Sequence, residues 1–196
     1  INSIKNNARL GKSDWSVLEA DESDGSFVHI SPTYSIVTNI DREHMDYYNS
    51  LDDLKRHFIK FMKNVPSFGK TFICIDDKNN REIIKKIKSK NYLTYGTSEI
   101  SNFRIQNISE QSGFSKFDLK ISLLGKKKLY IKSIKIPLIG LHNIRNATAA
   151  IAVCHSIGIS NNFIKKGLLN FKGVQRRFNF IFNYRGSDFY DDYAHH

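Results

Sequence analysis

Short apolar runs that end in polar residues recur through the first half of the chain. Asp14–Leu18 and Tyr34–Ile40 each lead into a cluster rich in acidic residues, and Thr71–Ile75 ends in two aspartates. A short run of this kind is typical of a strand that is buried on both faces of a parallel sheet. We therefore expect three such strands, with a fourth over Tyr92–Gly96.

Helical spacing lies between these strands. From Leu51 to Phe61, apolar residues recur every three or four positions on one face. Either Ser50 or Asn49 is suited to cap this helix. A second helix, basic and amphipathic, is expected over Asn80–Lys90. Strands that alternate with helices favour an α/β fold in which helices flank a mostly parallel sheet.

Between about residues 103 and 137 the hydrophobic period changes to two. Phe114–Leu123 and Leu129–Ile136 alternate apolar and polar residues, and a turn at Gly125 joins them. This pattern predicts a small antiparallel β hairpin, or a three-stranded meander if Phe103–Ile108 joins it. The remaining expected elements are helices over His142–Ile157 and Asn162–Asn170 and strands over Phe178–Phe182 and Asp188–Tyr193.

The composition is that of a globular protein without a membrane segment. The chain has 196 residues, of which 40% are hydrophobic and 25% charged, and its mean hydropathy is −0.40. No apolar run approaches the roughly 20 residues that span a bilayer, and the first residues lack the apolar core of a signal peptide. Cys74 and Cys154 lie far apart in apolar segments, which is typical of reduced, buried thiols. We therefore expect a cytoplasmic protein with no membrane partner.

The formal net charge of +11 raises the question of nucleic-acid binding. The lysines are spread along the chain, however. Those in Lys85–Lys90 fit the solvated face of a helix, and Lys126–Lys128 fit a hairpin turn. We expect no specific nucleic-acid partner, although a basic nucleic-acid or nucleotide-binding module without catalysis remains an alternative.

Two of the predicted strand ends carry side chains suited to a metal ion. Glu19, Asp21, Glu22 and Asp24 follow the first strand, and His44 follows the second. Carboxylates are hard oxygen ligands for Mg²⁺ or Mn²⁺, and an imidazole adds a nitrogen ligand. Ligands of parallel sheets collect outside the carboxyl ends of the strands. The alternative is that the acidic residues only cap a helix or coat a loop.

A glycine and two asparagines mark the start of the helix near residue 142. Asn143 and Asn146 are three positions apart and share a helical face, and Gly140 precedes them. Carboxamides both donate to and accept from the edge of an adenine, but such residues also serve as ordinary helix caps. No P-loop of the form GxxxxGK[ST] occurs in the sequence.

Paired basic residues and an aspartate pair occupy the last part of the chain. Arg176 and Arg177 fit phosphate recognition, and an aspartate at a strand end, as in Asp191–Asp192, fits a ribose hydroxyl. The pair His195–His196 fits either a phosphate contact or two surface residues. From spacing alone, the chain is a candidate metal-dependent nucleotide site on an α/β sheet.

Read in order, these segments resemble the motifs of the central domain of Mur ligases. They are Glu19–Phe27, Thr38–Ile40 with Glu43–Asp46, Gly140–Ala147, Arg176–Phe178 and Asp191–His196. The resemblance covers essentially the whole chain. The EADESD segment of this chain most resembles the corresponding segment of the family member that joins L-alanine to UDP-N-acetylmuramate. The murein-tripeptide recycling ligase, in which EADEYD is expected, is the alternative within the family.

The resemblance implies an ATP-dependent, amide-forming ligase of peptidoglycan precursor synthesis. Such an enzyme converts a substrate carboxylate into an acyl phosphate, which the amine of an amino acid then attacks. The implied cofactors are ATP and Mg²⁺ (or Mn²⁺), and the implied substrates of the full-length enzyme are UDP-N-acetylmuramate and L-alanine. Metal ions and cationic side chains stabilise the charge that develops in such a transfer.

The resemblance also implies roles for single residues. Glu19 would ligate the Mg²⁺ that bridges the ATP phosphates, and His44 would ligate a second metal ion near the substrate carboxylate. The other implied contacts are His142, Asn143 and Asn146 with adenine, Arg177 and Asp192 with phosphate and ribose, and His195 and His196 with phosphate or the amino acid. His44, Arg177, His195 and His196 are thus the candidate catalytic residues.

Two departures from the family pattern shape the expected domain organisation. Phe58 stands where several Mur ligases carry a carbamylated lysine, and the P-loop of the family is expected upstream of Ile1. We therefore expect residues 1–186 to be a central ATPase domain without its P-loop, and residues 187–196 to begin the junction to a carboxyl-terminal domain. Such a chain is expected to be inactive by itself. A non-catalytic relative that only binds nucleotide is a further alternative.

Overall fold

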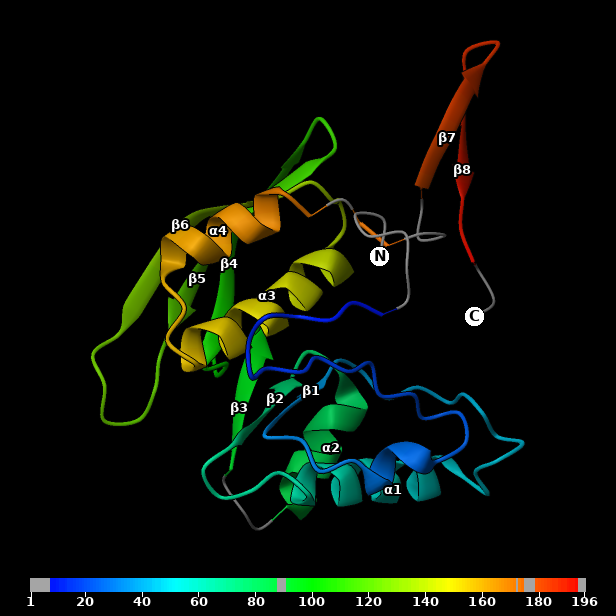
Figure 1. The fold of residues 1–196 in the computed structure, drawn as a ribbon, viewed down its shortest axis with the longest axis vertical. Helices are drawn as coiled ribbons and strands as arrows, with labels where there is room; N and C mark the ends of the chain where they lie inside the picture. The colour runs from blue at the N-terminus through cyan, green and yellow to red at the C-terminus, as the bar shows by residue number, and fades with distance from the viewer. Residues whose placement is uncertain (1–7, 88–90, 172, 175–178, 194–196) are drawn as a thin grey trace.

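The computed structural model describes residues 8–87, 91–171, 173–174 and 179–193. Its main feature is a six-stranded sheet in which the strands follow one another in chain order (Figure 1). Neighbouring strands are parallel from β1 to β4 and antiparallel from β4 to β6. The strands are β1 (Tyr34–Val37), β2 (Lys70–Cys74), β3 (Tyr92–Gly96), β4 (Phe103–Gln111), β5 (Phe114–Ile121) and β6 (Leu129–Ile136). The predicted α/β fold with a small antiparallel meander is confirmed.

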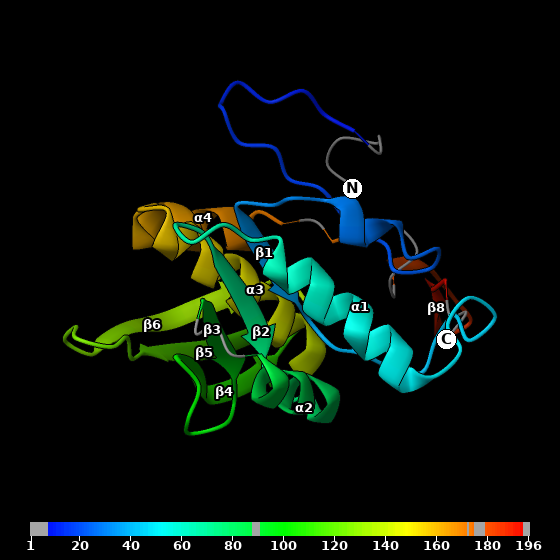
Figure 2. The same ribbon diagram turned by 90° about the horizontal axis from the view of Figure 1, so that it is seen from below.

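Helices cover both faces of this sheet (Figures 1 and 2). They are the short 3₁₀ helix η1 (Ser26–His29) and the α-helices α1 (Leu51–Lys63), α2 (Lys78–Lys86), α3 (Leu141–Ser156) and α4 (Asn161–Leu169). Side chains of a strand alternate between the two faces. Ile73 of β2 accordingly belongs to the core under α1 and α2, whereas its neighbours Phe72 and Cys74 belong to the core under α3 and α4.

The helix starts follow from local side-chain chemistry. Ser50 caps α1, and its hydroxyl accepts a hydrogen bond from the backbone N–H of Asp53 at 3.2 Å. The Asp77 carboxylate caps α2 by accepting the N–H of Asn80 at 2.7 Å. Both caps satisfy backbone donors that a helix leaves unpaired in its first turn.

A separate two-stranded antiparallel sheet follows α4. Strands β7 (Asn179–Tyr184) and β8 (Ser187–Asp191) are joined by Arg185 and Gly186, which both have positive φ angles of 50° and 80°. Such a turn matches the twist of a tight hairpin. Figure 1 shows this hairpin standing away from the main sheet. The division of the chain after residue 186 stays a prediction.

The expected strand over Asp14–Leu18 was wrong. These residues have no regular structure and are exposed, Val17 to 98%. A strand is stable only when its backbone groups pair with a neighbour. Within the described residues, β1 pairs with β2 alone, so nothing beside β1 extends the sheet to Asp14–Leu18. The second expected strand also ends earlier, at Val37 instead of Ile40.

No helix in the described part of the chain is long and apolar enough to cross a bilayer.

We expect Phe72→Ala to lower the free energy of unfolding by about 3–5 kcal/mol, because it opens a cavity in the core. Phe72 is 0% exposed and contacts the rings of Tyr34 and Phe103. Urea denaturation measures the change. The matched control is Phe68→Ala, since Phe68 is 77% exposed and should change stability little. Equal losses in the two variants would contradict this packing.

Candidate nucleotide and metal site

A polar cavity of about 300 Å³ lies at the carboxyl ends of the first three strands and beside the first turns of α3. This is the edge at which ligands of open α/β sheets bind. Its lining residues are Thr38, Asn39, Cys74, Asp76, Asp77, Tyr95, His142, Arg145 and Asn146. Of the three residues assigned to adenine, His142 and Asn146 are therefore in the cavity wall. The third, Asn143, is not part of this lining, and its amide donates to the Ile139 carbonyl at 2.7 Å.

Two buried asparagines hold the loop that follows β1. Asn79 donates to the carbonyl of Ile40 at 2.7 Å, and Asn80 donates to the carbonyls of Thr38 and Cys74 at 3.1 and 2.9 Å. Both side chains are less than 5% exposed. The sequence analysis missed both contacts, because it began the basic amphipathic helix at Asn80 and gave neither asparagine a role. The available signal was two adjacent asparagines, a residue type that helix interiors disfavour.

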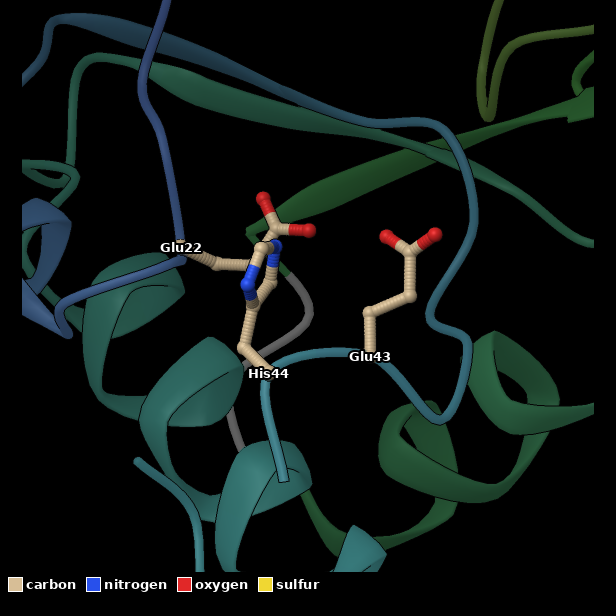
Figure 3. Close-up of side chains that lie close together, drawn as sticks. All are labelled: Glu22, Glu43 and His44. Carbon is tan, nitrogen blue, oxygen red and sulfur yellow. The ribbon is translucent and has the colours of Figure 1, made fainter. Parts of the chain in front are cut away.

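A candidate metal centre lies between this loop and the segment that precedes η1. Ligand atoms of Glu22, Glu43 and His44 all lie within 4.8 Å of one another (Figure 3). Two carboxylates and one imidazole fit Mn²⁺ well, and the carboxylates also suit Mg²⁺. His44 was predicted as a metal ligand, whereas Glu22 appeared only within the acidic cluster and Glu43 was missed. Glu19 is exposed and is not a member of this group.

Tyr48 connects the two loops that supply these three side chains. Its side chain is buried, and its hydroxyl donates to the backbone carbonyl of Glu22. The backbone N–H groups of Tyr47 and Tyr48 both bond to the His44 carbonyl at 3.0 Å, which closes a tight turn. Burial raises the pKa of Tyr48 to about 12, so this phenol stays protonated near neutral pH. The hydroxyl is therefore a permanent donor to the Glu22 loop.

The other acidic residues of the cluster support the local turns. Asp21 accepts the N–H of Ser23 at 2.8 Å, and Asp24 accepts the N–H of Ser26 at 2.9 Å. Hydrogen bonds from Ser23 lower the pKa of Asp21, and those from Ser26 lower the pKa of Asp24. Both interpretations of this acidic segment, metal binding and support of a loop, thus apply, but to different residues. Asp21 and Asp24 shape the loop, and Glu22 faces the candidate metal centre.

Among the remaining predicted site residues, those that the structure describes do not line the cavity. Arg177, His195 and His196 lie outside the described residues. Asp192 is exposed and follows β8. Phe58, at the position compared with the carbamylated lysine, packs against the ring of Phe27 with 5.1 Å between ring centroids. The roles assigned to Arg177, Asp192, His195 and His196 stay predictions.

Comparison with known sequences agrees with this architecture. The family model of the Mur ligase middle domain matches residues 2–154. A UDP-N-acetylmuramate–L-alanine ligase from Pelagibacter ubique is 68% identical over 196 residues, and one from Bartonella quintana is 43% identical over 197 residues. Both alignments cover 100% of this chain but only 42% of the relative.

Solved structures give the same result. UDP-N-acetylmuramate–alanine ligase MurC from Thermotoga maritima superposes with a TM-score of 0.68 and 28% identity, over 90% of this chain and 38% of that protein. MurF from Acinetobacter baumannii superposes with a TM-score of 0.70 and 25% identity, over 87% and 36%. The fold is that of the middle domain of these ligases. The chain belongs to the Mur ligase family, as a middle domain.

Asp76, in the cavity wall, generates a prediction about acid stability. Burial by itself raises the pKa of this carboxyl, but hydrogen bonds from Thr97 and the ion pair with Arg145 outweigh burial, so the net pKa is lowered. A carboxyl with a lowered pKa stabilises the fold fully above its unfolded-state value, near 3.8, and this stability is lost as pH falls further.

We therefore expect Asp76→Asn to be less stable than the wild type at pH 7, with a difference that shrinks as the pH falls from about 4 towards 2. Urea midpoints measured across this range test the expectation. Asp52→Asn is the control, because Asp52 is exposed on α1. A difference that stays constant with pH would contradict the assignment.

Proposed function

We propose that the complete protein carrying this chain is an ATP-dependent ligase that joins L-alanine to UDP-N-acetylmuramate. The observation that carries this proposal is the pairing of two features at one sheet edge. Thr38 and Asn39 line the polar cavity, and the same loop continues to Glu43 and His44 of the candidate metal centre. A nucleotide site beside a divalent-cation site is what phosphoryl transfer from ATP needs. The match of the whole chain to 42% of the length of L-alanine ligases supports the choice of substrates.

The cavity side chains suit the base of a nucleotide. His142 and Asn146 reach the cavity from successive turns of α3, and both present groups that donate and accept hydrogen bonds. They would hold the base in place, and in this way they would position the nucleotide for the reaction. Positioning of this kind contributes much of the acceleration in phosphoryl transfer, because little covalent chemistry is left to the protein.

Glu22, Glu43 and His44 would hold the divalent cation. Their donor set of carboxylate oxygens and one imidazole nitrogen fits Mg²⁺ or Mn²⁺. When bound, the cation neutralises the negative charge on the phosphates and on the activated carboxylate. The family resemblance assigns Glu19 to the cation as a further ligand. Glu19 is exposed and precedes Glu22 by three residues on the same loop, and its role stays part of this proposal.

The direct test is phosphate release by the complete purified protein. We expect release that requires both L-alanine and UDP-N-acetylmuramate. Turnover with a murein tripeptide instead of L-alanine would indicate the recycling ligase. Tight polynucleotide binding at physiological salt, without any such turnover, would favour a basic binding module instead.

Replacing a candidate metal ligand should abolish this activity. We expect His44→Ala to lower kcat/KM at least about 100-fold, because the cation loses a direct ligand. Coupled measurement of ADP release gives the rate. His29→Ala is the matched control, because His29 is exposed and lies outside the site. A rate loss of the same size in both variants would contradict the assignment.

Removing one hydroxyl should loosen the metal centre without removing a ligand. We expect Tyr48→Phe to weaken Mn²⁺ binding about 10-fold, since the Glu22 backbone loses the hydrogen bond that ties it to the His44 loop. Calorimetric titration with Mn²⁺ measures the affinity. Tyr47→Phe, at the neighbouring half-exposed ring, is the control. Unchanged affinity in Tyr48→Phe would show that the two loops are held together in another way.

A further inference from the structure

The Asp76 carboxylate joins three segments of the chain. It follows the end of β2, and its oxygens accept the backbone N–H groups of Thr97 and Ser98 at 3.0 and 3.2 Å and the Thr97 hydroxyl at 3.0 Å. It also accepts Nε of Arg145 on α3 at 2.8 Å. The Asp76 side chain is only 7% exposed and that of Arg145 is 33% exposed, so this ion pair is partly shielded from solvent.

The backbone of Asp76 is held from the opposite face of the sheet. Arg81 on α2 donates to the carbonyls of Ile75 and Asp76 at 2.6 and 3.0 Å. Space for the carboxylate comes from Gly96, whose φ is 146° and where an added Cβ would lie 2.5 Å from an Asp76 oxygen. Because the carboxylate is anchored in this way, it offers Arg145 of α3 a fixed partner, in addition to the packing of Ile144 in the core.

Arg145 lies within the stretch of α3 that faces the cavity. It is three residues after His142 and directly precedes Asn146, and all three line the cavity. The first turn of α3 has a second carboxylate contact, from Glu110 to the N–H of Gly140 at 2.7 Å. An α-helix moves as a rigid unit over a few turns, so anchoring Arg145 fixes how its neighbours are rotated about the helix axis.

We propose that Asp76 and Arg145 form a positioning pair that holds α3 so that His142 and Asn146 face the base of the bound nucleotide. The inference rests on the proposed function, because it assigns the cavity to ATP. Arg145 affects the nucleotide through its neighbours His142 and Asn146. Its own Nε is bonded to Asp76, which follows the end of β2, and not to the nucleotide.

Steady-state kinetics of the complete protein test the pair. We expect Arg145→Met to raise the KM for ATP about tenfold while kcat at saturating ATP stays within about twofold. Asp76→Asn should have a similar effect, and the double variant should be no worse than either single one, since the two residues act as one unit. Arg145→Lys should restore part of the affinity. The KM for UDP-N-acetylmuramate should not change in any of them.

Arg104→Met is the matched control. Arg104 forms an ion pair with Glu99 at 2.8 Å and has a similar exposure, 25% against 33% for Arg145, but it does not line the cavity. An unchanged KM for ATP in Arg145→Met would refute the inference while leaving the proposed function intact. A fall in kcat alone would also refute it, because Arg145 would then contact the reacting phosphate. A wild-type protein without ATP-dependent turnover would refute both the function and the inference.

Discussion

Three consecutive side chains of one helix satisfy the backbone where two parallel strands end, and the candidate site is built on this arrangement. Asn79, Asn80 and Arg81 at the start of α2 donate to carbonyls at the ends of β1 and β2. A buried carbonyl without a donor costs about 1–3 kcal/mol, so these contacts keep the strand ends in one conformation. The loops that leave those ends carry both the cavity wall and the candidate metal ligands.

The site is consequently assembled from both faces of the sheet. From the α2 face, Arg81 fixes the backbone of Asp76, and on the other face the carboxylate of Asp76 holds Arg145 of α3. Tyr48 plays the corresponding part for the metal centre, where its buried hydroxyl joins the Glu22 loop to the His44 turn. The buried Tyr48 hydroxyl and the largely buried Asp76 carboxylate thus support the two parts of the candidate site, in the way that supporting residues keep protein sites ready for their ligands.

Much of this fold was predictable because its signals are local. The strands Tyr92–Gly96 and Leu129–Ile136 have the predicted bounds, and Ser50 caps α1 as expected. The strand predicted over Asp14–Leu18 was wrong, because an apolar run forms a strand only beside another strand with which its backbone can pair. His44 and Asn146 were predicted from their positions at a strand end and a helix start, and His142 from the family resemblance. Glu43, Asn79 and Asn80 were missed, since their roles depend on contacts with residues distant in the sequence.

The sequence by itself determined the order of the elements, the edge of the sheet that carries the site and the family to which the chain belongs. Hydrophobic periods and helix caps are short-range properties, and the family motifs are runs of adjacent residues. Only the tertiary structure decided which acidic residues face one another and that Asp76 pairs with Arg145, 69 positions away. The physical reason is that such pairs depend on the packing of α2 and α3 against opposite faces of the sheet, which no local pattern encodes.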